Sequence, residues 1–253
     1  MITISSLQLN AWLAALLWPS ARILALLSVA PMFGHGSVPA RVKLGLGILL
    51  SLVVSPAVPA GVALVSLDGV MILALQIAIG LALGFMMRIA FAAVELAGEL
   101  CGLTMGLSFA SQFDPLSEHP ATVTSQLFSW LALLVFISSN LHLAMLAALA
   151  DSFQQIPISD LSPGSGFIRQ LAMAGAKVFS GGLQLAMPVI ATLLMTNLAL
   201  GILTRAAPQL NVFSIGMPIT LTVGFAVIIL LMPYLANPLV STLGSAITST
   251  LSR

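Results

Sequence analysis

The sequence predicts an all-α protein embedded in a membrane, and two observations carry this prediction. Hydrophobic residues make up 59% of the chain and charged residues only 6%, a balance that soluble globular domains do not show. The apolar residues also gather into stretches of about 20 residues or more, the length that an α-helix needs to cross a bilayer. A net charge of +1 gives no support to nucleic-acid binding.

Six apolar stretches qualify as long helices of a single all-helical chain over residues 1–253, and proline, glycine or asparagine turn signals separate them. They run over residues 7–30, 42–65, 70–93, 123–150, 171–203 and 212–235. Interior prolines should kink several of these helices. We expect the third helix to continue to about Met105, and Pro56 to end the second one early. The Ser/Thr-rich tail, residues 237–253, is expected to fray or to lie against a partner.

The most informative segment runs from residue 87 to residue 115, because it carries ionisable groups in an otherwise apolar region. In an α-helix, Glu95 and Glu99 each project within about 20° of Arg88. A charge at mid-bilayer costs about 3 kcal/mol or more, so this polar helix stripe must face protein or water. Three interpretations stay open. The stripe lines a conduit as a charge network, or it forms an intramembrane ion pair that holds two helices in register, or its charges belong to helix ends that snorkel to water.

A loop follows directly and extends to about residue 121. It combines small polar residues with two phenylalanines, which an ordinary surface loop would not carry. Its first ten residues are Gly106, Leu107, Ser108, Phe109, Ala110, Ser111, Gln112, Phe113, Asp114 and Pro115. One interpretation is a pore plug, in which the aromatic side chains fill a channel and glycine lets the loop move. The alternative is a re-entrant loop packed in the core of the helix bundle.

The sequence gives no support to catalysis, and it predicts neither a cofactor nor a metal ion. Glu95 and Glu99 have no histidine at helical spacing, so they lack the partner that a metal site or an acid–base pair would need. Cys101 is the only cysteine, which excludes a cysteine cluster. The run from Gly106 to Ala110 lacks the last glycine of a Gly-x-Ser-x-Gly nucleophile turn. We therefore expect that the protein is not an enzyme.

Three separate regions of the chain resemble the FliR family, whose members are subunits of the bacterial flagellar type III export gate. These regions are residues 38–46 (VPARVKLGL), residues 95–115, and residues 197–211 (NLALGILTRAAPQLN). The injectisome subunit SctT is the nearest confusable relative, and the run around Arg205 looks more flagellar. One departure is the stretch Cys101-Gly102-Leu103-Thr104, where many relatives carry a larger apolar residue and a glutamine. Roles that rest on those side chains are therefore not carried over.

The resemblance implies an architecture, a location and a set of partners. FliR looks like a fusion of a FliP-like and a FliQ-like part, and one copy assembles with five FliP and four FliQ subunits into a closed gate. The gate sits at the flagellar basal body in the bacterial inner membrane, raised toward the periplasmic side. FlhB, FlhA and the exported flagellar proteins are the further partners. In the family a loop plugs the pore beside a ring of FliP methionines; it matches Gly106 to Pro115 here, with Phe109 and Phe113 as the filling groups.

A stand-alone secondary transporter of a small solute is the alternative from another class. Intramembrane charges, kinked helices and six spans would suit such a protein. Transporters often contain inverted repeats with matching broken segments. The chain offers only a weak echo of this kind, between residues 34–39 and residues 211–218.

Overall fold

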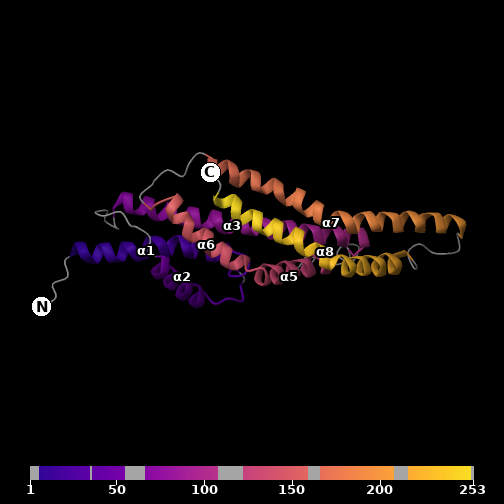
Figure 1. Cartoon of the computed structure of the whole chain (residues 1–253), viewed down its shortest axis with the longest axis horizontal. Coiled ribbons are helices and arrows are strands. Elements are labelled where there is room, and N and C mark those ends of the chain that lie inside the picture. Colours follow the sequence, from indigo (N-terminus) through magenta and orange to yellow (C-terminus); the bar gives the residue numbers. More distant parts are fainter. Residues whose placement is uncertain are drawn as a thin grey trace, which may run out of the picture. The chain divides into compact units, whose positions relative to one another are not determined.

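The computed structural model describes residues 6–34, 36–54, 66–107, 122–158, 166–207 and 216–251, and the elements within these ranges are α-helices (Figure 1). They are α1 (Ser6–Val29), α2 (Ala40–Val54), α3 (Leu67–Met105), α5 (Val123–Ser138), α6 (Leu141–Gln155), α7 (Gly166–Ala206) and α8 (Met217–Leu251). The prediction of an all-α protein is confirmed. The third predicted helix does continue to Met105.

Among the residues that the structure describes, four helices are long and apolar enough to cross a membrane. They cover Asn10–Val29, Leu67–Met105, Leu171–Ala206 and Met217–Ile247, and the pair α5–α6 adds a fifth span if its broken halves are counted together. The second predicted stretch is helical only to Val54, in line with the expectation that Pro56 ends this helix early. Its 15 residues extend about 22 Å, less than the roughly 30 Å of a bilayer core. The chain is an integral membrane protein.

The prediction of one continuous fourth helix over residues 123–150 is wrong. The helix ends at Ser138, and a new one begins after Asn140, which adopts a left-handed conformation with φ 55°. Asparagine adopts the left-handed conformation more readily than most residues, because its short polar side chain can form hydrogen bonds with the nearby backbone. The polar run Ser138-Ser139-Asn140 was the signal for this break. The expectation that the tail frays from residue 237 is also wrong, because α8 continues to Leu251.

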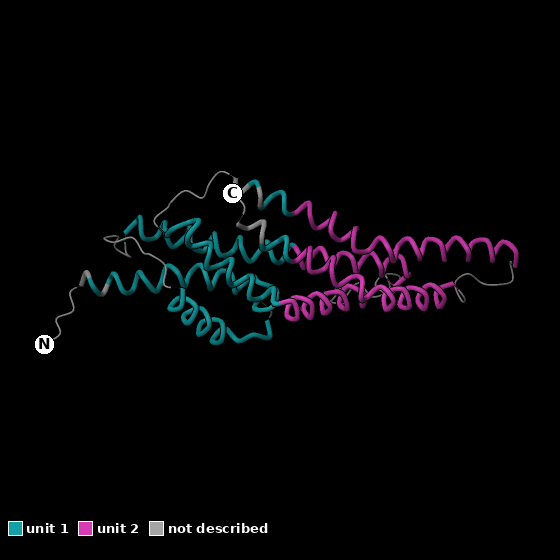
Figure 2. The backbone as a smooth tube through the Cα atoms, viewed as in Figure 1, with its two compact units in different colours: residues 1–89, 140–174, 244–253 teal, residues 90–139, 175–243 magenta. Residues whose placement is uncertain are grey.

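The chain divides into two compact units (Figure 2). Unit 1 comprises Met1–Ile89, Asn140–Ala174 and Gly244–Arg253, and unit 2 comprises Ala90–Ser139 and Gly175–Leu243. Three helices, α3, α7 and α8, contribute residues to both units. Each unit is described separately below.

In unit 1, α1 and α3 pack closely because α3 carries two glycines one turn apart. A Cβ atom on Gly80 would collide with the carbonyl oxygen of Arg22 and lie 2.8 Å from the Cβ of Ala25. A Cβ on Gly84 would lie 2.9 Å from the carbonyl oxygen of Leu26. This Gly-x-x-x-Gly spacing is a common device of membrane helices, since it lets two backbones approach and gain dispersion contacts.

Unit 2 uses the same device further along α3. A Cβ on Gly98 would lie 2.7 Å from the Cα of Ser125 in α5, and a Cβ on Gly182 of α7 would lie 2.9 Å from the carbonyl oxygen of Ala93. An edge-to-face aromatic pair supports the contact of α3 with α5. The rings of Phe91 and Phe136 lie 5.7 Å apart at an interplanar angle of 76°.

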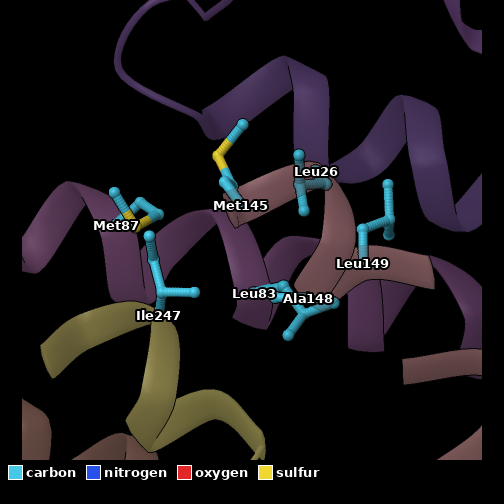
Figure 3. A pocket seen from close by; sticks show the side chains of 7 residues that line it. All are labelled: Leu26, Leu83, Met87, Met145, Ala148, Leu149 and Ile247. Carbon is cyan, nitrogen blue, oxygen red and sulfur yellow. The ribbon is translucent and has the colours of Figure 1, made fainter. Parts of the chain in front are cut away.

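A small void inside unit 1 is lined by apolar side chains (Figure 3). The lining residues are Leu26, Leu83, Met87, Met145, Ala148, Leu149 and Ile247. The cavity volume is about 10 Å³, which is at the lower limit for one water molecule. Its lining is mostly apolar, and the void is too small for a solute. We interpret it as a packing gap between side chains.

The close contact between α1 and α3 can be tested at Gly80. Replacing Gly80 by alanine should destabilise the folded chain by about 2 kcal/mol, because the new methyl group has no space against α1. The matched control is Gly45→Ala in α2, where a Cβ meets nothing within 4 Å. The control should stabilise the chain by up to about 1 kcal/mol through helix propensity. Thermal unfolding of the purified variants in detergent measures both effects, and equal losses of stability would contradict the packing role of Gly80.

Candidate functional site

The first half of the candidate site is the end of α3, which is fixed by a glycine cap. Gly106 has φ 86°, a left-handed conformation that glycine adopts without steric strain. Its N–H donates to the carbonyl of Leu103 at 3.1 Å, and the N–H of Leu107 donates to the carbonyl of Gly102 at 3.0 Å. These two bonds form a Schellman motif, which satisfies the last carbonyls of the helix. Gly106 thus caps α3, and its role in letting the loop move stays a prediction.

The second half is the start of α5, where Thr122 serves as the N-cap. Its side-chain oxygen accepts the N–H of Ser125 at 3.2 Å, as N-caps do. The same hydroxyl lies 3.2 Å from Oε2 of Glu99 and 3.1 Å from Oγ1 of Thr124. A hydroxyl has one hydrogen and two lone pairs, so Thr122 donates to the carboxylate and accepts from Ser125 and Thr124. All its hydrogen-bonding capacity is used.

Further contacts hold these two helix ends together. The hydroxyl of Ser125 donates to the backbone carbonyl of Glu95 at 3.1 Å. A Cβ on Gly102 would collide with Oγ1 of Thr124. Glycine is therefore needed at the point of α3 against which the start of α5 packs. We call Glu99, Gly102, Gly106, Thr122 and Thr124 the loop base. The loop base lies within unit 2 and brackets residues 108–121.

The end of α3 is also anchored to α8 inside unit 2. Met105 is completely buried, and its backbone carbonyl accepts a hydrogen bond from the hydroxyl of Thr220 at 3.3 Å. Gly224 leaves room for the side chain of Met105, whose sulfur would lie 3.0 Å from a Cβ placed there. The last turn of α3 is thus seated against both α5 and α8.

The polar helix stripe divides into residues with different environments. Glu99 is half-buried and belongs to the loop base through its hydrogen bond with Thr122. Arg88 and Glu95 are exposed on the surface of the isolated chain. The sequence thus placed three charges correctly on one helix, but only Glu99 joins the loop base.

Most of the predicted pore plug cannot be located. Gly106 and Leu107 are described, and both take part in the cap of α3. The other predicted plug residues lie outside the described part of the chain: Ser108, Phe109, Ala110, Ser111, Gln112, Phe113, Asp114 and Pro115. Whether they form a plug stays a prediction. Within the described ranges, His, Cys, Asp and Glu side chains form no group of three that could hold a metal ion.

One residue that the sequence reasoning did not single out is Arg22. It is completely buried in unit 1, and its guanidinium group makes four hydrogen bonds. The sequence did contain a signal, because Arg22 is the only charged residue in the first apolar stretch. A lone charge at such a position has to find polar partners inside the protein.

The role of Thr122 in the loop base can be tested by removing its hydroxyl. Thr122→Val should lower the stability of the folded chain by about 1 kcal/mol, because α5 loses its N-cap and Glu99 loses a donor. Thr122→Ser keeps the hydroxyl and should stay close to the parent chain. Thermal unfolding of the two variants in detergent provides the comparison. If serine is as damaging as valine, the hydrogen bonds of Thr122 are not what stabilises this helix end.

Comparisons with known proteins agree with this picture. The family model for bacterial export proteins, family 1, matches residues 13–246. The chain is 45% identical to the flagellar biosynthetic protein FliR of Escherichia coli, over 93% of this chain and 91% of that protein. It is 46% identical to FliR of Pectobacterium carotovorum over 92% and 90%, and 34% identical to FliR of Bacillus subtilis over 83% of each. The chain therefore belongs to the FliR family of bacterial export proteins and is a membrane component of the flagellar export apparatus.

Proposed function

We propose that this chain forms and closes part of the conduit through which unfolded flagellar proteins are exported. The observation that carries the proposal is the loop base, which fixes both ends of an aromatic-bearing segment at one place in unit 2. Membership of the FliR family supports the export role. The chain then acts as a scaffold and seal rather than as an enzyme.

A seal of this kind needs a firm attachment, since a plug that drifts away from the pore leaves it open. The Schellman cap at Gly106 and the N-cap at Thr122 provide such an attachment for residues 108–121. An extended chain covers at most about 3.5 Å per residue. Phe109 therefore stays within about 10 Å of the Cα atom of Gly106, and Phe113 within about 25 Å. The length of the chain thus limits how far either residue can lie from the loop base.

The proposal has a second part, which is that α3 contacts neighbouring subunits. The exposed charges on α3 support it. Arg88 and Glu95 lie on an apolar helix that is long enough to span a membrane, yet they are exposed in the isolated chain. Contact with lipid would cost several kcal/mol for each charge. We infer that these two side chains fix α3 against other subunits of the export apparatus.

The neighbours that we propose follow from family membership. One copy of this chain would assemble with five FliP and four FliQ subunits, and FlhB and FlhA would bind the resulting gate. Its place would be the inner membrane at the flagellar basal body, raised toward the periplasmic side. This arrangement would surround much of the chain with protein. It would account for the exposed large apolar and aromatic side chains of unit 2, such as Phe179, Met195 and Tyr234.

The plug can be tested by deleting residues 109–113. The deletion should raise the leak of ions or small molecules through the gate in living cells, because it removes both phenylalanines while leaving the loop base intact. Replacing both phenylalanines by alanine should also raise the leak, whereas replacing both by leucine keeps apolar bulk and serves as the control. Leak is measured with an impermeant dye or as a loss of membrane potential. A leak at the parent level in an assembled gate would rule out the plug.

The assembly can be tested by native mass spectrometry. The tagged chain, extracted in mild detergent from cells that also express its neighbouring export genes, should carry five FliP and four FliQ subunits. A different copy number would revise the stoichiometry alone. A lone monomer or a homodimer, with the other subunits present but unbound, would instead favour the stand-alone transporter.

A further inference from the structure

The guanidinium group of Arg22 is the most deeply buried charge among the residues that the structure describes. Arg22 lies in the middle of α1 and is 0% exposed. Burying a charge is expensive unless hydrogen bonds replace its hydration. Within the described ranges, no carboxylate lies at ion-pairing distance from it. The compensation must therefore come from neutral groups around it.

Those neutral groups come from two other helices of unit 1. Nε of Arg22 donates to Oε1 of Gln76 in α3 at 2.8 Å. Nη1 donates to the carbonyl of Ser152 in α6 at 2.9 Å and to its hydroxyl oxygen at 3.1 Å. Nη2 donates to the carbonyl of Ile156 at 2.9 Å. The guanidinium carbon also lies 4.2 Å from the centre of the Phe153 ring, a cation–π contact.

The acceptors in α6 lie at its C-terminal end, where the carbonyl of Ser152 also accepts the N–H of Ile156 at 2.9 Å. This helix ends at Gln155, so the carbonyls of Ser152 and Ile156 belong to its last turn and its C-cap. The C-terminal end of a helix carries a partial negative charge and favours a cation. The last turn of α6 itself contains no basic residue. Arg22 supplies the missing cation from another helix.

Gln76 shows that α3 is arranged around the same group. Its Oε1 accepts from Arg22, and its Nε2 is buried without a hydrogen-bond partner. Rotating the amide would satisfy neither group, because it would turn an N–H toward the N–H of Arg22. Gly80 lies one turn later on α3 and allows the backbone to reach Arg22. Nε2 of Gln76 thus stays without a partner, because Oε1 of the same side chain must face the guanidinium group of Arg22.

We propose that Arg22 is a positioning residue that caps the C-terminus of α6 from α1. The cap fixes the point at which the chain leaves α6. Three different nitrogens of the guanidinium reach Gln76, Ser152 and Ile156, whereas an ammonium group carries all its donors on one nitrogen. The charge alone is therefore insufficient, and lysine should not replace arginine. This proposal does not depend on the plug or on the copy number of the gate.

The test is hydrogen exchange in the full chain, purified with its neighbouring export subunits. In Arg22→Lys, exchange of the backbone amides of Gln154, Gln155 and Ile156 should rise about tenfold, because the last turn of α6 loses its cap. The amides of Met145 and Leu149, earlier in the same helix, should change less than about twofold. The matched control is Arg41→Lys, which alters an exposed arginine of α2 and should leave α6 unchanged.

Two results would overturn the proposal. A uniform rise over α1, α3 and α6 would mean that Arg22 supports packing in general, and no rise at Gln154–Ile156 would mean that α6 needs no cap. If Arg22→Lys does not accumulate, Ser152→Ala provides the second variant. It removes one of the four hydrogen bonds and keeps arginine in place. Its exchange should rise about threefold at the same three amides, and a rise elsewhere or none would contradict the cap.

Discussion

Close backbone contact at the glycines of α3 is the constraint on which the rest of the structure depends. Between membrane helices, apolar side chains gain little from each other that lipid does not also offer, so association relies on close packing and hydrogen bonds. Gly80 and Gly84 bring α1 to one stretch of α3, and Gly98 and Gly102 bring α5 to another. The polar contacts of both units form at these places. Arg22 reaches Gln76 beside Gly80, and Thr122 reaches Glu99 beside Gly102.

The two polar centres solve the same physical problem with different groups. Each satisfies the end of a helix with a polar side chain and ties that end to another helix. In unit 1 a cation from α1 meets the carbonyl end of α6. In unit 2 the hydroxyl of the N-cap Thr122 accepts an N–H at the start of α5 and donates a hydrogen bond to a carboxylate of α3. Both arrangements suit a chain with few charges, because they satisfy polar groups largely through backbone atoms.

Sequence reasoning predicted the helices well wherever apolar length was the deciding property. It located α3 to its last residue, since the apolar run and the glycine that follows it are local signals. It missed the break at Asn140 because a three-residue polar run was outweighed by the long apolar average around it. It also ended α8 too early, because serine and threonine lower helix propensity in a peptide, whereas α8 here continues to Leu251.

The candidate site was predicted in outline and not in its contacts. The sequence could place Arg88, Glu95 and Glu99 on one helix face, but it could not tell that Glu99 would meet a threonine 23 residues away. Tertiary contacts of this kind leave no periodic trace. Arg22 was visible as a lone charge, yet its acceptors are backbone carbonyls, which every residue has. A sequence pattern cannot identify such a partner.

The way in which the loop base is built has a consequence for how this region can diverge. The helix ends on either side of residues 108–121 are stabilised by their own caps and by each other. The closure entropy of a loop grows slowly, by about 0.6 kcal/mol for each doubling of its length. A change in the length of residues 108–121 therefore changes the closure entropy of the folded chain little. The seal that we propose can therefore change with the length of this segment while the two helix ends keep their caps.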